Sequence, residues 1–177
     1  MSNSDLIQEL CGACGLCCNG AIFADVQLQP RDKETRLRAL GLEMKRASHG
    51  RGVSKFLQPC AAHDGCRCLI YSERPSYCRE FECALLKNVS SGNISRKRAL
   101  SIIREAKGKL ATINKLLARL ENSDETLSHR ARFNQVTREM KEKKSDQVKR
   151  AAFGELTLAV HELNVLIAAS FYPGPRE

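Results

Sequence analysis

The sequence Cys11-Gly12-Ala13-Cys14-Gly15-Leu16-Cys17-Cys18 places four cysteines within eight residues, in the spacing C-x2-C-x2-C-C. Three of the sulfur atoms can converge from one tight loop, and the glycines at 12, 15 and 20 predict positive φ angles in that loop. Thiolates of C-x2-C loops are ligands of zinc ions and of iron–sulfur centres. Because adjacent side chains point in different directions, Cys17 and Cys18 favour two centres or one polynuclear centre over one tetrahedral ion.

A second group of cysteines follows at positions 60, 66, 68, 78 and 83. The total of nine is odd, so the cysteines cannot all pair internally. Residues 1–10 contain Asp5 and Glu9 and no apolar run, so we expect no signal peptide. A secreted disulfide scaffold is therefore the less favoured alternative, and we expect a metal-binding protein of the cytoplasm.

The order and the flanking residues of these cysteines resemble the YkgJ-type CxxCxxCC family. The resemblance covers roughly residues 8–83 and rests on the first cysteine group, Pro59-Cys60, Cys68-x-Ile70-Tyr71 and Arg74-Pro75-x-x-Cys78-Arg79. It implies a domain that chelates zinc or iron, with an iron–sulfur cluster as one form of the centre. Some relatives methylate lysines on flagellin, so the resemblance also implies an iron–sulfur-dependent protein-modifying enzyme as an alternative. The sequence contains no G-x-G-x-x-G or H-E-x-x-H motif that would support the enzyme alternative. Whether the protein is an enzyme therefore stays open.

The resemblance, together with position in the sequence, implies eight metal ligands: Cys11, Cys14, Cys17, Cys18, Cys60, Cys68, Cys78 and Cys83. Cys66 is ranked below them, because the family usually has another residue at that position. His49 and His63 are predicted to be solvated, since enough thiolates are present without them. Three arginines beside the ligands either offset the negative charge of a thiolate-bound metal or form ordinary surface ion pairs: Arg67, Arg74 and Arg79.

The second half of the chain is predicted to be helical. A sustained stripe of apolar residues at alternating steps of four and three predicts a helix over 95–120, with Ser95 as its N-cap. Further helices are expected at about 125–143 and 146–171. The junction at 143–146 is either a turn, which we favour, or the middle of one long helix. The apolar stripe of the first helix packs either on the last helix or on a second chain, as a homodimer.

The first half gives weaker signals. We expect a short amphipathic turn over residues 1–10, a short strand within 22–28, a helix over 31–40 and a loop over 43–57. The predicted fold class is mainly α: a small irregular cysteine-rich metal-binding domain (1–90), followed by a basic, two- or three-helix antiparallel bundle (91–177).

The formal charge of +9 is concentrated in the second half. Residues 1–83 contain 11 basic and 10 acidic residues, whereas residues 84–177 contain 18 and 10. The basic helices either present an ordinary solvated face, which we favour, or bind an acidic protein or nucleic acid. We expect no membrane partner, because no run of about twenty apolar residues occurs.

Overall fold

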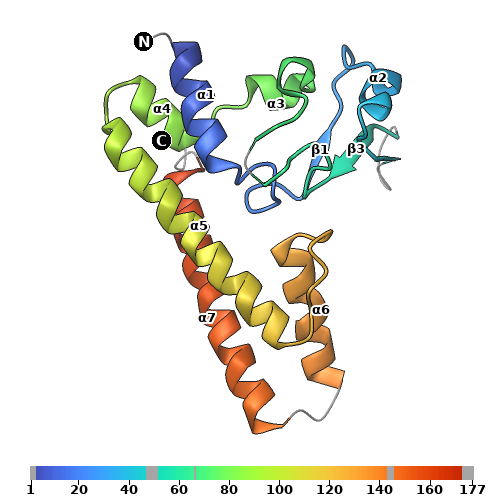
Figure 1. Cartoon of the computed structure of the whole chain (residues 1–177), viewed down its shortest axis with the longest axis vertical. Coiled ribbons are helices and arrows are strands. Elements are labelled where there is room, and N and C mark those ends of the chain that lie inside the picture. The colour runs from blue at the N-terminus through green and yellow to red at the C-terminus, as the bar shows by residue number, and fades with distance from the viewer. Residues whose placement is uncertain (1–2, 47–51, 66, 143–145, 173–177) are drawn as a thin grey trace. The chain divides into compact units, whose positions relative to one another are not determined.

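The structure is a computed structural model of the 177-residue chain, and it describes residues 3–46, 52–65, 67–142 and 146–172 (Figure 1). The chain is mainly α-helical and forms two compact units, Met1–Glu82 and Cys83–Glu177. The second unit therefore begins just before α4 (Ala84–Ser90), close to the change in charge at 83/84, whereas the domain boundary expected at 90/91 lies just after this helix.

The first unit opens with α1 (Asn3–Cys14), where the sequence predicted only a short turn. Leu10 is buried on one face of this helix, and Leu6 and Ile7 are half-buried beside it. Spacings of three and four residues place these apolar side chains on one helical face, which favours a continued helix. As a result, Cys11 and Cys14 lie at the end of a helix rather than in a loop.

A three-stranded antiparallel sheet follows, in the order β1-β3-β2. It contains β1 (Asp25–Gln27), β2 (Met44–Arg46) and β3 (Ser54–Leu57). β1 confirms the predicted strand, but the predicted loop over 43–57 was wrong, because it contains two strands. Val26 pairs with Phe56 and both are buried, so tertiary packing stabilises strands too short to show a two-residue alternation.

Short helices complete the first unit: α2 (Glu34–Ala39), the 3₁₀ helix η1 (Tyr71–Glu73) and α3 (Ser76–Glu80). The apolar core joins the sheet to α2 through six buried residues: Val26, Leu28, Leu37, Leu42, Phe56 and Ala62. The start of α3 is fixed by Asp32, whose carboxylate accepts hydrogen bonds from the backbone N–H and the hydroxyl of Ser76 at 2.8 and 2.7 Å.

The second unit contains α4, α5 (Arg96–Arg119), α6 (His129–Glu142) and α7 (Gln147–Ser170). α5 and α7 run side by side in opposite directions (Figure 1), which confirms the predicted antiparallel bundle. Both long helices are capped as their sequences require. Ser95 Oγ accepts from the Arg98 N–H at 3.2 Å, and Asp146 Oδ1 accepts from the Lys149 N–H at 2.7 Å. α6 and α7 are separate helices, and residues 143–145 between them lie outside the described residues.

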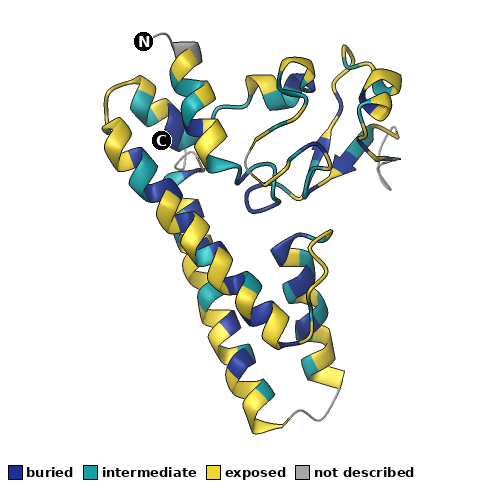
Figure 2. Ribbon diagram, in the orientation of Figure 1, coloured by how far each residue is buried: buried dark blue, intermediate teal, exposed yellow. Residues whose placement is uncertain are grey.

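The facing sides of α5 and α7 form the core of this unit (Figure 2). Every residue of the predicted α5 stripe is buried: Ala99, Ile103, Ala106, Leu110, Ile113, Leu117 and Leu120. The buried residues of α7 are Ala152, Leu156, Val160, Leu163 and Ile167. Ion pairs between Lys109 and Glu162 and between Arg119 and Glu155 border this apolar contact at 2.7 and 3.2 Å.

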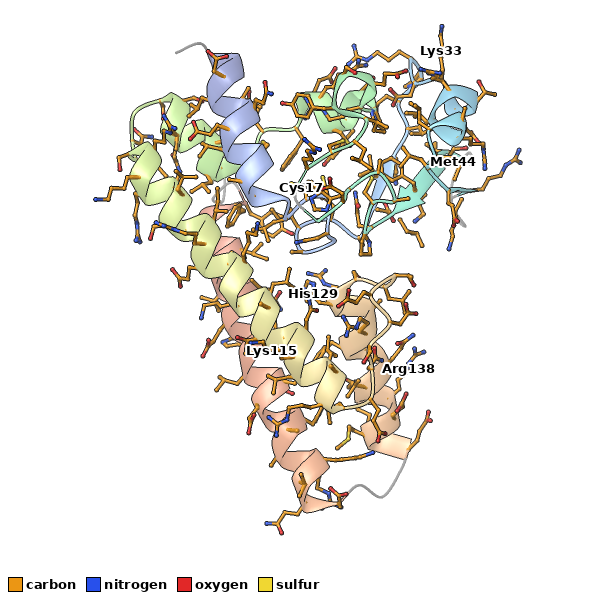
Figure 3. The ribbon with its side chains drawn as sticks, in the orientation of Figure 1. Cys17, Lys33, Met44, Lys115, His129 and Arg138 are labelled. Carbon is orange, nitrogen blue, oxygen red and sulfur yellow. The ribbon has the colours of Figure 1, made fainter. Side chains whose placement is uncertain are left out.

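α6 is held by polar side chains that the sequence did not single out. Arg132 is only 2% exposed, and its guanidinium donates to the side-chain oxygens of Asn114 and Asn122, each at 3.2 Å. His129 is also buried, at the N-terminal end of α6 (Figure 3). Together with the buried Val136, these two polar residues form the buried face of α6.

By length and mean hydropathy alone, α7 is apolar enough to cross a membrane, contrary to the sequence-based expectation. Within the second unit it buries one face on α5, and Glu155 and Glu162 pair with basic residues of that helix. These contacts account for the apolar residues of one α7 face as part of the helical core.

Candidate metal centre

The first cysteine group continues from the end of α1 into a short loop fixed by backbone hydrogen bonds (Figure 3 labels Cys17). Gly15 has a φ of +68°, and its carbonyl accepts from the N–H of Cys18 at 3.0 Å. Leu16 is fully buried, and its carbonyl accepts from Ala21 and Ile22. A buried apolar side chain therefore anchors the loop between the cysteines.

The two cysteine groups meet through the main chain. The N–H of Cys60 donates to the carbonyl of Cys18 at 2.8 Å. Three residues further on, the N–H of His63 donates to the carbonyl of Cys60 at 2.9 Å, and His63 forms an isolated antiparallel bridge with Cys68. Cys78 comes from α3 and, with Cys60, packs against the apolar core.

Four thiols form what we call the thiol quartet: Cys18, Cys60, Cys68 and Cys78. Each pair within the quartet interacts electrostatically, so the four sulfur atoms share one neighbourhood. The quartet draws on three separate segments of the chain: the loop after α1, residues 60–68 and α3.

The environment of the quartet disfavours bare thiolates. Burial, followed by the charges of the other quartet members, raises the pKa of Cys18 and of Cys78 to about 12. Burial also raises the pKa of Cys60. These thiols are thus protonated at neutral pH, and a bound cation would reverse this preference by stabilising the thiolates.

The three arginines near the quartet have different roles. The Arg74 guanidinium lies 3.6 Å from the centre of the Tyr71 ring, and its positive charge favours the thiolate of Cys78. Arg67 is mostly exposed and forms a surface ion pair with Asp64 at 3.5 Å. The charge of Arg79 acts on Asp32. Of the two readings of these arginines, charge compensation at the site is supported for Arg74 and a surface ion pair for Arg67.

The other predicted ligands are not part of the thiol quartet. Cys11 is exposed and interacts electrostatically with Cys18, while Cys14 and Cys17 are half-buried. Cys83 is the N-cap of α4 and the first residue of the second unit. The eight cysteines that the structure describes are not joined in disulfides. Cys66 and His49 lie outside the described residues.

His63 was predicted to be solvated, and this prediction was wrong. His63 as a whole is half-buried, and its Nε2 atom is buried. A Cβ added to Gly15 would lie 2.9 Å from this Nε2, so the imidazole occupies the space beside Gly15. The one related feature of the sequence is Gly15 itself, because a larger residue at this position would clash with the imidazole.

The donor set suits zinc or iron, because thiolates are soft ligands and the neighbouring imidazole is of a type that also binds both metals. The neighbourhood suits them too, since the four thiols come from three segments and interact pairwise. As the side chains stand, no three His, Cys, Asp or Glu side chains among the described residues converge at ligating distance. The fit is therefore one of donor chemistry and proximity.

The family comparison agrees with this donor set. The family described as CxxCxxCC, putative zinc- or iron-chelating domain, matches residues 10–106, more than half of the chain. The match covers both cysteine groups and continues into the first half of α5. No curated protein and no solved structure matches the chain significantly. The chain thus belongs to the CxxCxxCC family of putative zinc- or iron-chelating domains.

Proposed function

We propose that this protein binds zinc or iron in the cytoplasm through the thiol quartet. The observation that carries the proposal is the mutual proximity of four thiols from three segments, joined by the hydrogen bond between Cys60 and Cys18. A metal ion bound by ligands from separate segments stabilises the fold that brings them together. A reducing compartment would keep the thiols available for binding.

The metal would stabilise the first unit rather than perform hydrolysis. Four thiolates complete a tetrahedral zinc shell and leave no position for water or substrate. The same ligands suit a single iron ion or an iron–sulfur cluster, which would supply electron-transfer chemistry. Arg74 would offset part of the negative charge of the thiolates from its place over Tyr71.

The test is the metal content of protein purified without oxygen from cells supplied with zinc and iron. We expect zinc or iron in the wild-type protein, and one ion fewer after Cys60→Ser. Cys66→Ser is the matched control, since the same chemical change there is expected to leave the metal in place. Full metal content in Cys60→Ser would contradict the role of the quartet. An absorbance spectrum then separates colourless zinc protein from a coloured iron centre.

A second candidate function rests on what we call the basic stripe: Lys97, Arg104 and Lys115 on α5. α5 contains eight Lys or Arg residues and only one acidic residue. Steps of seven and eleven residues, about two and three helical turns, place the stripe on one exposed face over roughly 27 Å. Within the described residues, no ion pair involves these three side chains. Figure 3 labels Lys115 on this helix.

The stripe suits the phosphate backbone of a nucleic-acid duplex. The exposed residues between its cations include Gly108 and Ala111, which leave room for close approach. α5 contains no aromatic residue, so it offers no platform for stacking single-stranded bases. Binding through phosphates alone would be independent of sequence and would weaken as salt rises.

Fluorescence polarisation with a labelled 20-base-pair DNA duplex of mixed sequence tests this function. Reversing the stripe (Lys97→Glu, Arg104→Glu, Lys115→Glu) should weaken binding at least tenfold. The control reverses three exposed cations of the first unit, which changes the net charge equally: Lys33, Lys45 and Arg46. Equal losses in both variants would show that net charge alone attracts the duplex. Tighter binding to polyglutamate than to DNA would assign the stripe to an acidic protein.

A further inference from the structure

α7 has a second apolar face, opposite the face that it buries on α5 (Figure 2 shows exposed positions along this helix in yellow). Large and small apolar residues recur on it at steps of three, four and seven residues, which keeps them on one side of the helix over about 31 Å. All of them are exposed. We call them the outer stripe: Ala151, Gly154, Leu158, Val165, Ala168 and, just after the helix, Tyr172.

The outer stripe is uncharged in a strongly basic chain. None of the 29 Lys and Arg residues lies between positions 151 and 172. The two carboxylates of this segment, Glu155 and Glu162, are paired with Arg119 and Lys109 of α5. The stripe therefore offers no cation to phosphates or to anionic lipid headgroups. Two copies of a chain with a net charge of +9 can meet here without bringing cations together.

Gly154 supports a close contact at this face. Glycine is unfavourable inside a helix, and Gly154 lies in the middle turns of α7. A Cβ added to it would meet nothing within 4 Å, so packing within the chain does not require a glycine here. Small residues on a helix surface let a bulky side chain of a neighbouring helix approach closely. The glycine thus fits a contact with another helix.

The order of large and small residues fits a second copy of α7 that runs in the opposite direction. With a two-fold axis at the level of position 163, Leu158 of one copy faces Ala168 of the other, and Gly154 faces Tyr172. Each contact combines a large side chain with a small one, which lets the two surfaces interdigitate. Val165 faces His161, whose imidazole tip reaches water at the rim of the contact.

We propose that the protein forms an antiparallel homodimer through the outer stripe of α7. The same patch then serves both copies, as a two-fold contact requires. The dimer goes beyond the proposed metal binding and does not depend on it, because the stripe contains no cysteine. It also differs from pairing through α5, whose apolar stripe α7 already covers within the chain. One helix face is a small interface, so the dimer dissociates on dilution.

Sedimentation equilibrium of the full-length protein over a series of concentrations tests the dimer. We expect the wild type to dimerise, and Leu158→Glu to raise the dissociation constant at least tenfold with unchanged circular dichroism, since Leu158 is exposed. Val148→Glu is the matched control, because Val148 is a still more exposed apolar residue of α7 outside the stripe, and it should dimerise as the wild type does. A wild type that stays monomeric, or equal dimerisation of Leu158→Glu, would overturn the proposal.

A size exchange tests the antiparallel register. Leu158→Ala leaves a gap against Ala168 of the second copy, and Ala168→Leu places two leucines against each other, so each change alone should weaken the dimer. The double variant restores one large and one small residue at each contact and should recover the dissociation constant of the wild type. A double variant that dimerises more weakly than both single variants would contradict this arrangement.

Flotation with vesicles of phosphatidylglycerol and phosphatidylcholine tests a membrane as the other occupant of the stripe. We expect Leu158→Glu to leave any binding to the vesicles unchanged, because the stripe pairs with a second copy. A monomeric wild type that floats with the vesicles, together with a Leu158→Glu variant that does not, would overturn the homodimer and assign the stripe to a lipid surface.

Discussion

The N–H of Cys60 donates a hydrogen bond to the carbonyl of Cys18 at 2.8 Å, and this bond joins the two cysteine groups. Close by, the N–H of Gln58 donates to the carbonyl of Ala24 at 3.0 Å. Main-chain bonds therefore bring two of the three quartet segments together without any bound metal. A metal ion would bind donors that the fold has already gathered.

Arg74 should tune metal affinity through its charge. Arg74→Gln removes the cation that favours the Cys78 thiolate, and we expect zinc affinity to fall on the order of tenfold, as for other groups that support metal ligands. A competition titration with a chromophoric chelator measures the change. Arg67→Gln is the control, because Arg67 pairs with Asp64 at the surface. Equal affinities for Arg74→Gln and the wild type would remove Arg74 from the site.

Leu117 should be essential to the helical unit. It is fully buried in the α5 stripe, so Leu117→Glu places a charge in the apolar contact and should cost on the order of 2–5 kcal/mol of unfolding free energy. Urea unfolding followed by circular dichroism measures the loss. Lys115→Glu, two residues away on an exposed position, should have little effect. If light scattering instead showed a dimer that Leu117→Glu dissociates into folded monomers, the stripe would pair between chains.

His129 should make the second unit sensitive to acid. Burial, followed by the charges of Arg130 and Arg132, lowers the pKa of His129 from 6.5 to about 4. The unfolded chain therefore binds a proton near pH 6.5 that the folded chain binds only near pH 4. The contribution of His129 to the unfolding free energy should be constant above pH 6.5. It should fall, by up to roughly 3 kcal/mol, as pH drops from 6.5 to 4.

The comparison with His129→Leu isolates this effect from the acid release of metal. Urea unfolding of the second unit at a series of pH values should show the wild type losing stability relative to the variant between pH 6.5 and 4. His161→Leu, at an exposed position, should follow the wild type. A constant difference between the wild type and His129→Leu across this range would assign the acid sensitivity elsewhere.

Long periodic patterns in the sequence predicted the second unit well. The α5 stripe extends over seven apolar residues, and Ser95 and Asp146 cap their helices through local side-chain contacts. Helix periodicity and capping depend on residues that are close in the sequence, so they can be predicted without knowledge of the tertiary structure. The same pattern is less exact at the start of α7, where the apolar Val148 is 72% exposed because the buried face begins only at Ala152.

The first unit was harder to predict because its elements depend on one another. β1 and β3 contain three and four residues, and the contact between Val26 and Phe56 stabilises them only after the chain has folded. The position of His63 depends on its main-chain hydrogen bond to Cys60 and on its bridge with Cys68, which the hydrogen bonds of the flanking residues form, and no spacing rule reveals either contact. Arg132 is buried because Asn114 and Asn122 supply its acceptors, a match visible only in three dimensions.

The most direct test of metal binding is to remove the metal from the purified protein and follow its melting curve. Because the quartet ligands come from separate segments, we expect a strong chelator to remove zinc or iron and to lower the melting temperature markedly. Most of the helical signal should remain at room temperature, since α5 and α7 contain no quartet cysteine. A protein that contains no zinc or iron, or one whose melting curve is unchanged after its metal has been stripped, would contradict the account.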